Sequence, residues 1–316
     1  MTHDQVDISI IIATYKQYSV LRDCLQSLTV NDVSSFEVIV VDDGGQLNRN
    51  IEKEVSGLNI RWIYLEENGG QARAQAEGAQ IASGEILAFL DDDAVIDKNW
   101  LLSIREYLGN HKNVSAIVGH VLPINDSHIL SRMRQTIYDR RAKKYFDLEY
   151  RKNLIDKYNL HVDPEVTICD HVSGGNFAIR KELFFYINGF RTDIRRNNDH
   201  DFSKRILEAG YCIGYNSNMI IYHHHNKGYR MLFKNMIAEG RSHIKMLPRN
   251  KSKVFLDIFI NLFCFPFKII KFKEMFNADK NKVKVYFIYT FLQFLDEIGR
   301  ILQGLRFIVL GFDKQS

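Results

Sequence analysis

Cysteine and proline are scarce in this chain of 316 residues, which contains four of each. The cysteines lie far apart and form no CxxC pair: Cys24, Cys169, Cys212 and Cys264. Structural zinc sites and disulfide frameworks need closely spaced or more numerous cysteines, so we expect neither. The prediction is a reduced protein with buried thiols, as in the cytosol.

Other signals are missing as well. The N-terminus has no basic segment followed by an apolar one, so we expect no signal peptide. The first apolar strand is followed by "ATYKQY", which has no glycine, and this excludes the GxGxxG site of a nicotinamide-binding protein. Two apolar C-terminal runs are interrupted by charged residues, such as Asp257 and Asp296, and by Pro266, so we expect neither to be a membrane-spanning helix.

Charge is unevenly distributed along the chain. The net charge is +4, but residues 241–316 carry 14 Lys and Arg against 6 Asp and Glu, which leaves −4 for residues 1–240. Lysines flank the Phe-rich C-terminal runs, a pattern typical of helices that lie on an anionic membrane surface. A helical hairpin packed on the rest of the chain or on a partner subunit is the alternative. The basic tail carries no nucleic-acid-binding motif, so we expect no nucleic acid partner.

Strand and helix patterns alternate over the first hundred residues. Apolar, strand-like runs occur at residues 8–15, 36–42, 60–65 and 86–91, and helical patterns lie at residues 19–28 and within 66–84. This alternation predicts βαβ units around a parallel sheet.

Carboxylates follow these buried runs directly. In the stretch "ILAFLDDDAVID" an apolar run is followed by Asp91, Asp92 and Asp93. In "FEVIVVDDGG" the apolar run is followed by Asp42 and Asp43. Open α/β sheets bind ligands beyond the carboxyl ends of their strands, where these residues would meet. Carboxylate oxygens are preferred by Mg²⁺ and Mn²⁺, so the pattern predicts a metal-assisted site for a diphosphate.

The second part of the chain has a different pattern. Residues 126–165 are charged and helical, which predicts an excursion on the surface, and the sheet is expected to resume at "VTICDHVSGGNFAIRKELF". An amphipathic helix, "DHDFSKRILEAGY", precedes a strand that runs into three histidines. Strand alternation places His223 and His225 on one face, and imidazole is a common metal ligand.

Five segments together resemble the family 2 glycosyltransferases. They are "ISIIIATYKQYSVLRDCLQSL", "FEVIVVDDGG", "NGGQARAQAEGAQIASGEILAFLDDDAVIDKNWL", "SGGNFAIRKELFFYINGF" and "NNDHDFSKRILEAGY", in that order. The resemblance covers roughly residues 7–245 and is to inverting enzymes of the GT-A fold. It implies a Rossmann-like α/β domain with a mixed, mostly parallel sheet flanked by helices.

The implied organisation is a catalytic domain over residues 1–245, followed by a basic, apolar helical extension over residues 246–316. Within the domain, about residues 1–100 would bind the nucleotide and about residues 101–245 the acceptor.

The implied activity is inverting transfer of a sugar from a nucleotide diphosphate sugar, usually a UDP-sugar, with Mn²⁺ or Mg²⁺ as cofactor. Thymidine diphosphate rhamnose is an alternative donor. A surface-polysaccharide or lipid-linked glycan would be the acceptor, and the enzyme would be cytoplasmic, held peripherally at the inner face of the membrane by its C-terminal helices. The rival interpretation is a catalytically inactive nucleotide-sugar-binding or scaffold protein of a polysaccharide-assembly complex.

The resemblance also implies roles for individual residues. The nucleotide pocket would be lined by Ala13, Thr14 and Tyr15, with Asp42 or Asp43 on the base, Asp91 or Asp92 near the ribose, and Arg73 in place of the usual phosphate-binding arginine. The metal would be held by Asp93, with Asp91, His223 and His225 as further ligands. The donor sugar and acceptor would lie beside Gly174, Gly175 and Asn176.

The general base is expected within "NNDHDF". In the family pattern an Asp preceded by Glu takes this role, and the matching position is Asp199, although Asn198 stands where the Glu would be. Because Asn198 is uncharged, Asp199 lacks the neighbouring negative charge that would raise its pKa in the family pattern. Asp201 is the second candidate, with capping of the helix or orientation of a neighbour as its expected role.

Overall fold

A computed structural model describes residues 7–223, apart from residues 32, 34, 46, 48–49, 56, 125–128 and 195–196, and a few positions further on. The chain divides into two compact units, residues 1–125 with 134–225, and residues 126–133 with 226–316. The sheet lies in the first unit. His225 and nearly all of the predicted extension over residues 246–316 lie outside the described residues.

The first four long strands are parallel neighbours, in the order β3-β2-β1-β4. They alternate with helices as predicted: β1 (Ile8–Thr14), α1 (Tyr18–Leu28), β2 (Phe36–Asp42), α2 (Asn50–Glu54), β3 (Ile60–Tyr64), α3 (Gln71–Ile81) and β4 (Ile86–Asp91). Because β1 and β2 are almost wholly buried, their runs of Ile and Val are continuous rather than alternating with polar residues.

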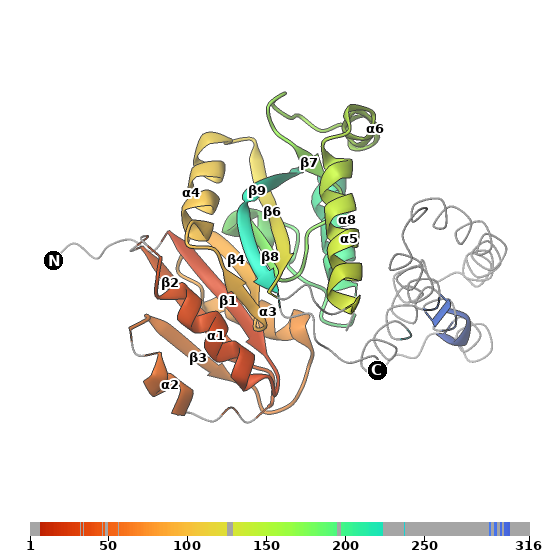
Figure 1. Cartoon of the computed structure of the whole chain (residues 1–316). Coiled ribbons are helices and arrows are strands. Elements are labelled where there is room, and N and C mark those ends of the chain that lie inside the picture. The colour runs from red at the N-terminus through yellow and green to blue at the C-terminus, as the bar shows by residue number, and fades with distance from the viewer. Residues whose placement is uncertain are drawn as a thin grey trace. The chain divides into compact units, whose positions relative to one another are not determined.

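Beyond β4 the sheet is extended by antiparallel pairings, except that β6 and β9 are parallel. The path continues β8-β6-β9-β5, and β7 pairs with β9. The strands and helices are β5 (Ala94–Ile96), α4 (Trp100–Asn110), β6 (Val114–Pro123), α5 (Ile129–Tyr145), α6 (Leu148–Tyr158), β7 (Ile168–Cys169), β8 (Asn176–Arg180), α7 (Lys181–Tyr186), α8 (Asn198–Glu208) and β9 (Cys212–His223). The predicted mixed sheet flanked by helices is therefore confirmed (Figure 1).

The small residues of α3 have a packing reason. A Cβ atom built on Gly78 would lie 2.7 Å from the Ile11 side chain and 3.2 Å from that of Val41. The helix therefore packs closely on β1 and β2, and only glycine or a shift of the helix is compatible with that distance. The Ala-rich pattern reflects this contact.

Aromatic side chains form the core where β4 meets β8. The Phe89 and Phe177 rings stack with centroids 4.7 Å apart. Around them lie Phe184 of α7, Phe202 of α8, and Phe190 from the segment between these two helices. Burial of several aromatic side chains contributes strongly to stability, and here it anchors α7 and α8 to the sheet.

Residues 126–165 contain the predicted helical excursion, α5 and α6. Asp147 caps α6 by accepting a hydrogen bond from the Tyr150 N–H, and Asn159 ends it in the left-handed conformation. Within the part of the chain that is described, no helix has the length and apolar character needed to cross a bilayer.

Candidate active site

The ends of β1, β2 and β4 meet at one edge of the sheet. Ala13 is paired with Asp91, and Thr14 with Asp42, in the registers of the parallel strands. The Thr14 hydroxyl donates a 2.7 Å hydrogen bond to Asp92, which is 6% exposed. Asp92 is thus tied to β1, while Asp91 and Asp93 lie on either side of it in the chain. Tyr15, next along, is exposed.

Asp91, Asp93 and His223 form a compact cluster. Strand β9 pairs with β5 so that His223 lies opposite Ala94, next to Asp93. Nε2 of His223 is 3.3 Å from Oδ2 of Asp91 and 3.1 Å from Oδ1 of Asp93. The three ligand atoms all lie within 4.8 Å of one another. The folded sheet therefore brings Asp91 and Asp93 close to His223, which lies 132 positions after Asp91 in the sequence.

The donor set of this cluster fits a divalent cation. Burial would lower the pKa of His223, but its hydrogen bonds to the two carboxylates raise it to about 9. The imidazolium thus offsets one of the two carboxylate charges. Two carboxylate oxygens and one imidazole nitrogen are ligands that suit Mn²⁺, and the carboxylates alone suit Mg²⁺.

The Gly174–Gly175 turn separates this cluster from Asp199. A Cβ atom on Gly175 would lie 2.0 Å from Cγ of Asp91, whereas one on Gly174 would lie 3.9 Å from Cβ of Asp199. The Asp91 N–H donates to the Gly175 carbonyl at 3.2 Å. The two adjacent glycines therefore contact the carboxylate cluster on one side and the predicted base on the other.

Asp199 lies in the first turn of α8 and contacts His171. Its Oδ2 is 3.5 Å from Nε2 of His171, and its Oδ1 accepts a 2.9 Å hydrogen bond from the His200 N–H. Burial would raise the pKa of Asp199, but His171 and this N–H outweigh it and lower the pKa below its usual value. Asp199 is consequently a charged carboxylate at neutral pH.

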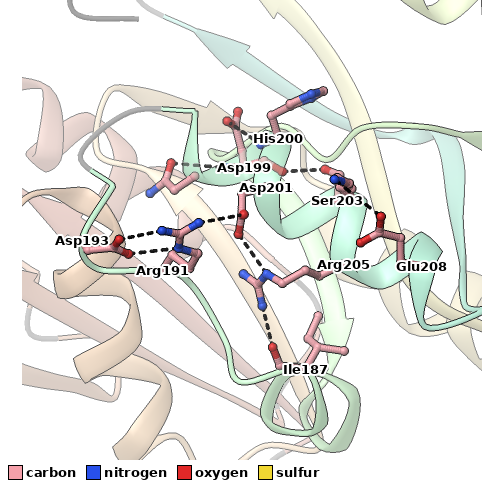
Figure 2. Close-up of polar contacts among 11 residues, drawn as sticks. Ile187, Arg191, Asp193, Asp199, His200, Asp201, Ser203, Arg205 and Glu208 are labelled. Carbon is pink, nitrogen blue, oxygen red and sulfur yellow. Dashed lines mark hydrogen bonds and ion pairs between the residues drawn. The ribbon is translucent and has the colours of Figure 1, made fainter. Parts of the chain in front are cut away.

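Asp201 faces away from Asp199 (Figure 2). It accepts a 2.8 Å hydrogen bond from Nε of Arg205 and lies 3.6 Å from the Arg191 guanidinium. Arg205 also donates to the Ile187 carbonyl. These contacts tie the start of α8 to the preceding loop.

Asp42 and Asp43 bind main-chain N–H groups. Asp42 accepts hydrogen bonds from Gly45 at 3.0 Å and Leu47 at 2.7 Å, and Asp43 accepts two from Gly69 and Gly70, both at 2.8 Å. Both carboxylates are nearly inaccessible to solvent. They hold the loops at the edge of the sheet, and direct contact with a nucleotide base stays a prediction.

Asn176 is fully buried. Its amide nitrogen donates to the carbonyls of His120 and Met219, and its oxygen accepts from the Trp100 indole at 2.9 Å. The side chain thereby joins β8 to β6, β9 and α4 where the β6–β9 register shifts. Its visible role is to position the Gly174–Gly175 turn, and its contact with a sugar stays a prediction.

Two glutamines on α3 belong to the site, although no sequence motif indicates them. The Gln71 amide donates to Oδ1 of Asp91 at 2.8 Å, and that of Gln75 to the Gly174 carbonyl at 3.1 Å. They lie one helical turn apart, on a helix that follows the Gly69–Gly70 pair near the carboxyl ends of β1, β2 and β4. Arg73 lies 3.5 Å from the exposed carboxylate of Glu67, and its contact with phosphate stays a prediction.

His171 is a further member of the site that the sequence did not reveal. It follows the short strand β7 and has no motif of its own, so only the folded chain shows that it meets Asp199.

The mixed sheet and the helices that flank it are those of the GT-A fold. The family model described as "Glycosyl transferase family 2" matches residues 9–185, more than half of the chain. The chain belongs to this family. The matched segment includes the three aspartates and the Gly174–Gly175 turn, and it ends before α8.

Two relatives and one solved structure illustrate the similarity. The glucosyl-dolichyl phosphate glucuronosyltransferase of Haloferax volcanii is 21% identical over 65% of this chain and 62% of its own length. The poly-beta-1,6-N-acetyl-D-glucosamine synthase of Staphylococcus epidermidis is 30% identical over 43% of this chain and 34% of its own. The chain thus spans less than two thirds of either relative.

The structural relative is the mannosyltransferase PcManGT of Pyrobaculum calidifontis, in complex with GDP-Man and Mn²⁺. It matches with a TM-score of 0.55 and 16% identity, over 97% of this chain and 76% of that one. This likeness confirms the fold.

Proposed function

We propose that this glycosyltransferase moves a sugar, with inversion, from a nucleotide diphosphate sugar to a hydroxyl group of a surface-polysaccharide or lipid-linked glycan. A UDP-sugar is the preferred donor. One observation carries the proposal: the Gly174–Gly175 turn has the cluster of Asp91, Asp93 and His223 on one side and the charged Asp199 on the other. A donor diphosphate and an acceptor hydroxyl can therefore be held next to each other.

Asp91, Asp93 and His223 would hold a divalent cation, Mn²⁺ or Mg²⁺. When bound, such an ion stabilises the negative charge of the departing nucleoside diphosphate as a Lewis acid. Gln71 keeps Asp91 in place through its amide, and the Thr14 hydroxyl keeps Asp92 turned toward β1. Preorganised ligands of this kind avoid the cost of rearrangement during the reaction.

Asp199 would accept the proton of the attacking hydroxyl. A base must be unprotonated at the working pH, and the lowered pKa of Asp199 meets that requirement. His171 holds one oxygen of the carboxylate and the His200 N–H the other. The proton moves onto Asp199 as the bond from the acceptor oxygen to the anomeric carbon forms and the bond to the diphosphate breaks.

The relatives support both substrates. The names of the two sequence relatives describe a glucuronosyltransferase acting on a dolichyl phosphate-linked sugar and a polysaccharide synthase, and the structural relative holds a nucleotide sugar with Mn²⁺. We further propose that residues 246–316 hold this enzyme at the inner face of the membrane, where such acceptors would be glycosylated.

A panel of nucleotide sugars tests the proposal. Purified full-length protein is incubated with UDP-, GDP- and thymidine diphosphate sugars in Mn²⁺, Mg²⁺ or EDTA, and donor binding and release of the nucleoside diphosphate are measured. We expect one donor to be hydrolysed slowly in Mn²⁺, no turnover in EDTA, and loss of metal-dependent donor binding in Asp93→Asn.

The matched control is Asp97→Asn, four residues away in the turn after β5 and outside the cluster. Full turnover in EDTA, or equal loss in both variants, would exclude the metal role of the cluster.

A further inference from the structure

A small pocket borders His171, the residue that contacts Asp199. It is formed by β6, β9, α5 and the loop before the Gly174–Gly175 turn. The lining residues that matter here are His120, Tyr138, Arg141, Tyr145, His171 and Tyr215. Because His171 both lines this pocket and contacts Asp199, a group bound in the pocket would be separated from the predicted base by one side chain.

Arg141 is the cationic member of the lining. Its side chain is exposed, and within the described part of the chain it makes no hydrogen bond or ion pair. Its charge nevertheless acts on Asp199, Tyr138 and Tyr145. A guanidinium group offers five N–H donors in a planar fork that matches a carboxylate or phosphate.

Among the described residues, no side chain of the pocket walls is paired with Arg141. The Tyr215 hydroxyl is 2.9 Å from Nδ1 of His120, and burial lowers the pKa of His120, so this histidine is neutral at pH 7. Burial raises the pKa values of Tyr145 and Tyr215, which stay protonated. The nearby Asp170 is paired with Lys144 at 3.1 Å. The pocket therefore combines aromatic faces with one cation whose hydrogen-bonding groups are available.

We infer that this pocket is an acceptor subsite for an anionic group, a carboxylate or a phosphate carried by the acceptor glycan. Arg141 binds the anion, the tyrosines contact the sugar that bears it, and the hydroxyl to be glycosylated lies toward Asp199. This inference rests on the proposed function, because it specifies the acceptor of the same reaction.

Soluble sugars test the subsite independently of transfer. Full-length protein in EDTA, so that no cation recruits the probe, is titrated with methyl glucuronide, glucose 6-phosphate and neutral methyl glucoside, and binding is followed by saturation-transfer NMR. We expect one or both anionic probes to bind and the neutral one to bind at least about tenfold more weakly, the worth of a charged hydrogen bond. The tighter anion indicates whether the acceptor carries carboxylate or phosphate.

The decisive comparison is Arg141→Ala against Arg140→Ala. Both substitutions remove one exposed positive charge from α5, but Arg140 does not line the pocket. We expect about a tenfold loss of anion binding in Arg141→Ala only, with partial retention in Arg141→Lys. Equal effects at the two positions, or equal binding of the neutral sugar, would overturn the inference.

The donor panel separates the two levels of the proposal. If a nucleotide sugar is bound and turned over while Arg141→Ala leaves probe binding unchanged, the anionic subsite alone is wrong. If no nucleotide sugar binds but the anionic probes depend on Arg141, the proposed activity is wrong and the subsite stands.

Discussion

Asp199 and Asp201 are two residues apart on one helix, and their surroundings assign them different tasks. Asp199 points toward His171 beside the Gly174–Gly175 turn, whereas Asp201 points toward Arg191 and Arg205 (Figure 2). Two guanidinium groups occupy the Asp201 carboxylate, whereas Asp199 lies beside the turn that borders the predicted metal cluster. The structure thus favours Asp199 as the base.

We expect Asp199→Asn to lower turnover by roughly two to four orders of magnitude, the usual weight of general base catalysis. The substitution is nearly isosteric, so donor binding and the melting temperature should change little. Steady-state kinetics, donor titration and thermal unfolding measure the three quantities.

Asp201→Asn is the matched comparison, and it should destabilise the fold by about 1–3 kcal/mol through loss of hydrogen bonds to charged groups. Its loss of stability should exceed its loss of turnover. The opposite result, in which Asp199→Asn stays near wild-type turnover and Asp201→Asn is inactive, would move the base by two residues.

The two glycines of the turn differ in how much space surrounds them. Neither has a positive φ, so backbone strain does not decide what a side chain would cost. Space does: a Cβ atom on Gly175 would lie 2.0 Å from the Asp91 carboxylate, whereas one on Gly174 would have a single neighbour, at an ordinary 3.9 Å.

We therefore expect Gly175→Ala to displace Asp91 and weaken Mn²⁺ binding by at least about tenfold, the order of magnitude seen when the support of a metal ligand is lost. Gly174→Ala should leave Mn²⁺ affinity nearly unchanged. Calorimetric titration of both variants with Mn²⁺ measures this difference. Equal Mn²⁺ affinities would show that Asp91 is not a ligand or that the turn yields freely.

At the scale of the element, the start of β2 is held by a buried carboxylate. Glu37 accepts hydrogen bonds from the Ser9 hydroxyl of β1 at 2.7 Å and from the Ser83 N–H before β4, and it pairs with Arg61 of β3 at 3.4 Å. One side chain thus joins three neighbouring strands and the end of α3, at the edge opposite the active site. Burial would raise the pKa of Glu37, but these donors outweigh it and lower the pKa.

A lowered pKa in the folded state means that Glu37 stabilises the fold above its unfolded pKa, and that this contribution is lost as the pH falls through the folded pKa. We expect Glu37→Gln to reduce the free energy of unfolding by about 1–3 kcal/mol at pH 7, and by much less below about pH 4. Urea unfolding at both pH values measures the difference in the free energy of unfolding between wild type and Glu37→Gln.

The exposed Glu77 of α3 provides the control, since Glu77→Gln should leave stability unchanged at either pH. A gap between wild type and Glu37→Gln that is the same at neutral and at acidic pH would indicate a packing effect rather than a charge effect.

At the scale of the whole molecule, the charge split between −4 in residues 1–240 and +8 in residues 241–316 is the feature with the largest consequence for location. Each Lys or Arg near an anionic bilayer contributes about 1 kcal/mol, and Phe side chains inserted at the interface add to it. Several such residues together would suffice for the reversible attachment that we propose.

We predict that full-length protein sediments with liposomes containing anionic lipid, that high salt weakens this, and that truncation near residue 250 abolishes it. Neutral liposomes are the control. A truncated protein that instead aggregates or changes oligomeric state, from a parent that ignores all liposomes, would show that the tail packs on protein.

Much of the site could be predicted from the chain alone. Apolar runs ending in Asp42–Asp43 and Asp91–Asp93 indicate parallel strands whose ends share an edge, because continuous apolar runs are buried on both faces and ligands bind beyond their carboxyl ends. The resemblance to the family extended this to Asp199 and His223. These are local signals, carried by residues next to an element boundary.

Only the tertiary structure decided which of these groups face one another. The pairing of β5 with β9 puts His223 against Asp93. The absence of a side chain on Gly175 leaves room for the Asp91 carboxylate. His171, Gln71 and Arg141 had no motif, since their roles depend on contacts between segments far apart in the sequence. The backbone hydrogen bonds that occupy Asp42 and Asp43 likewise appear only when the loops after β2 and before α3 fold together.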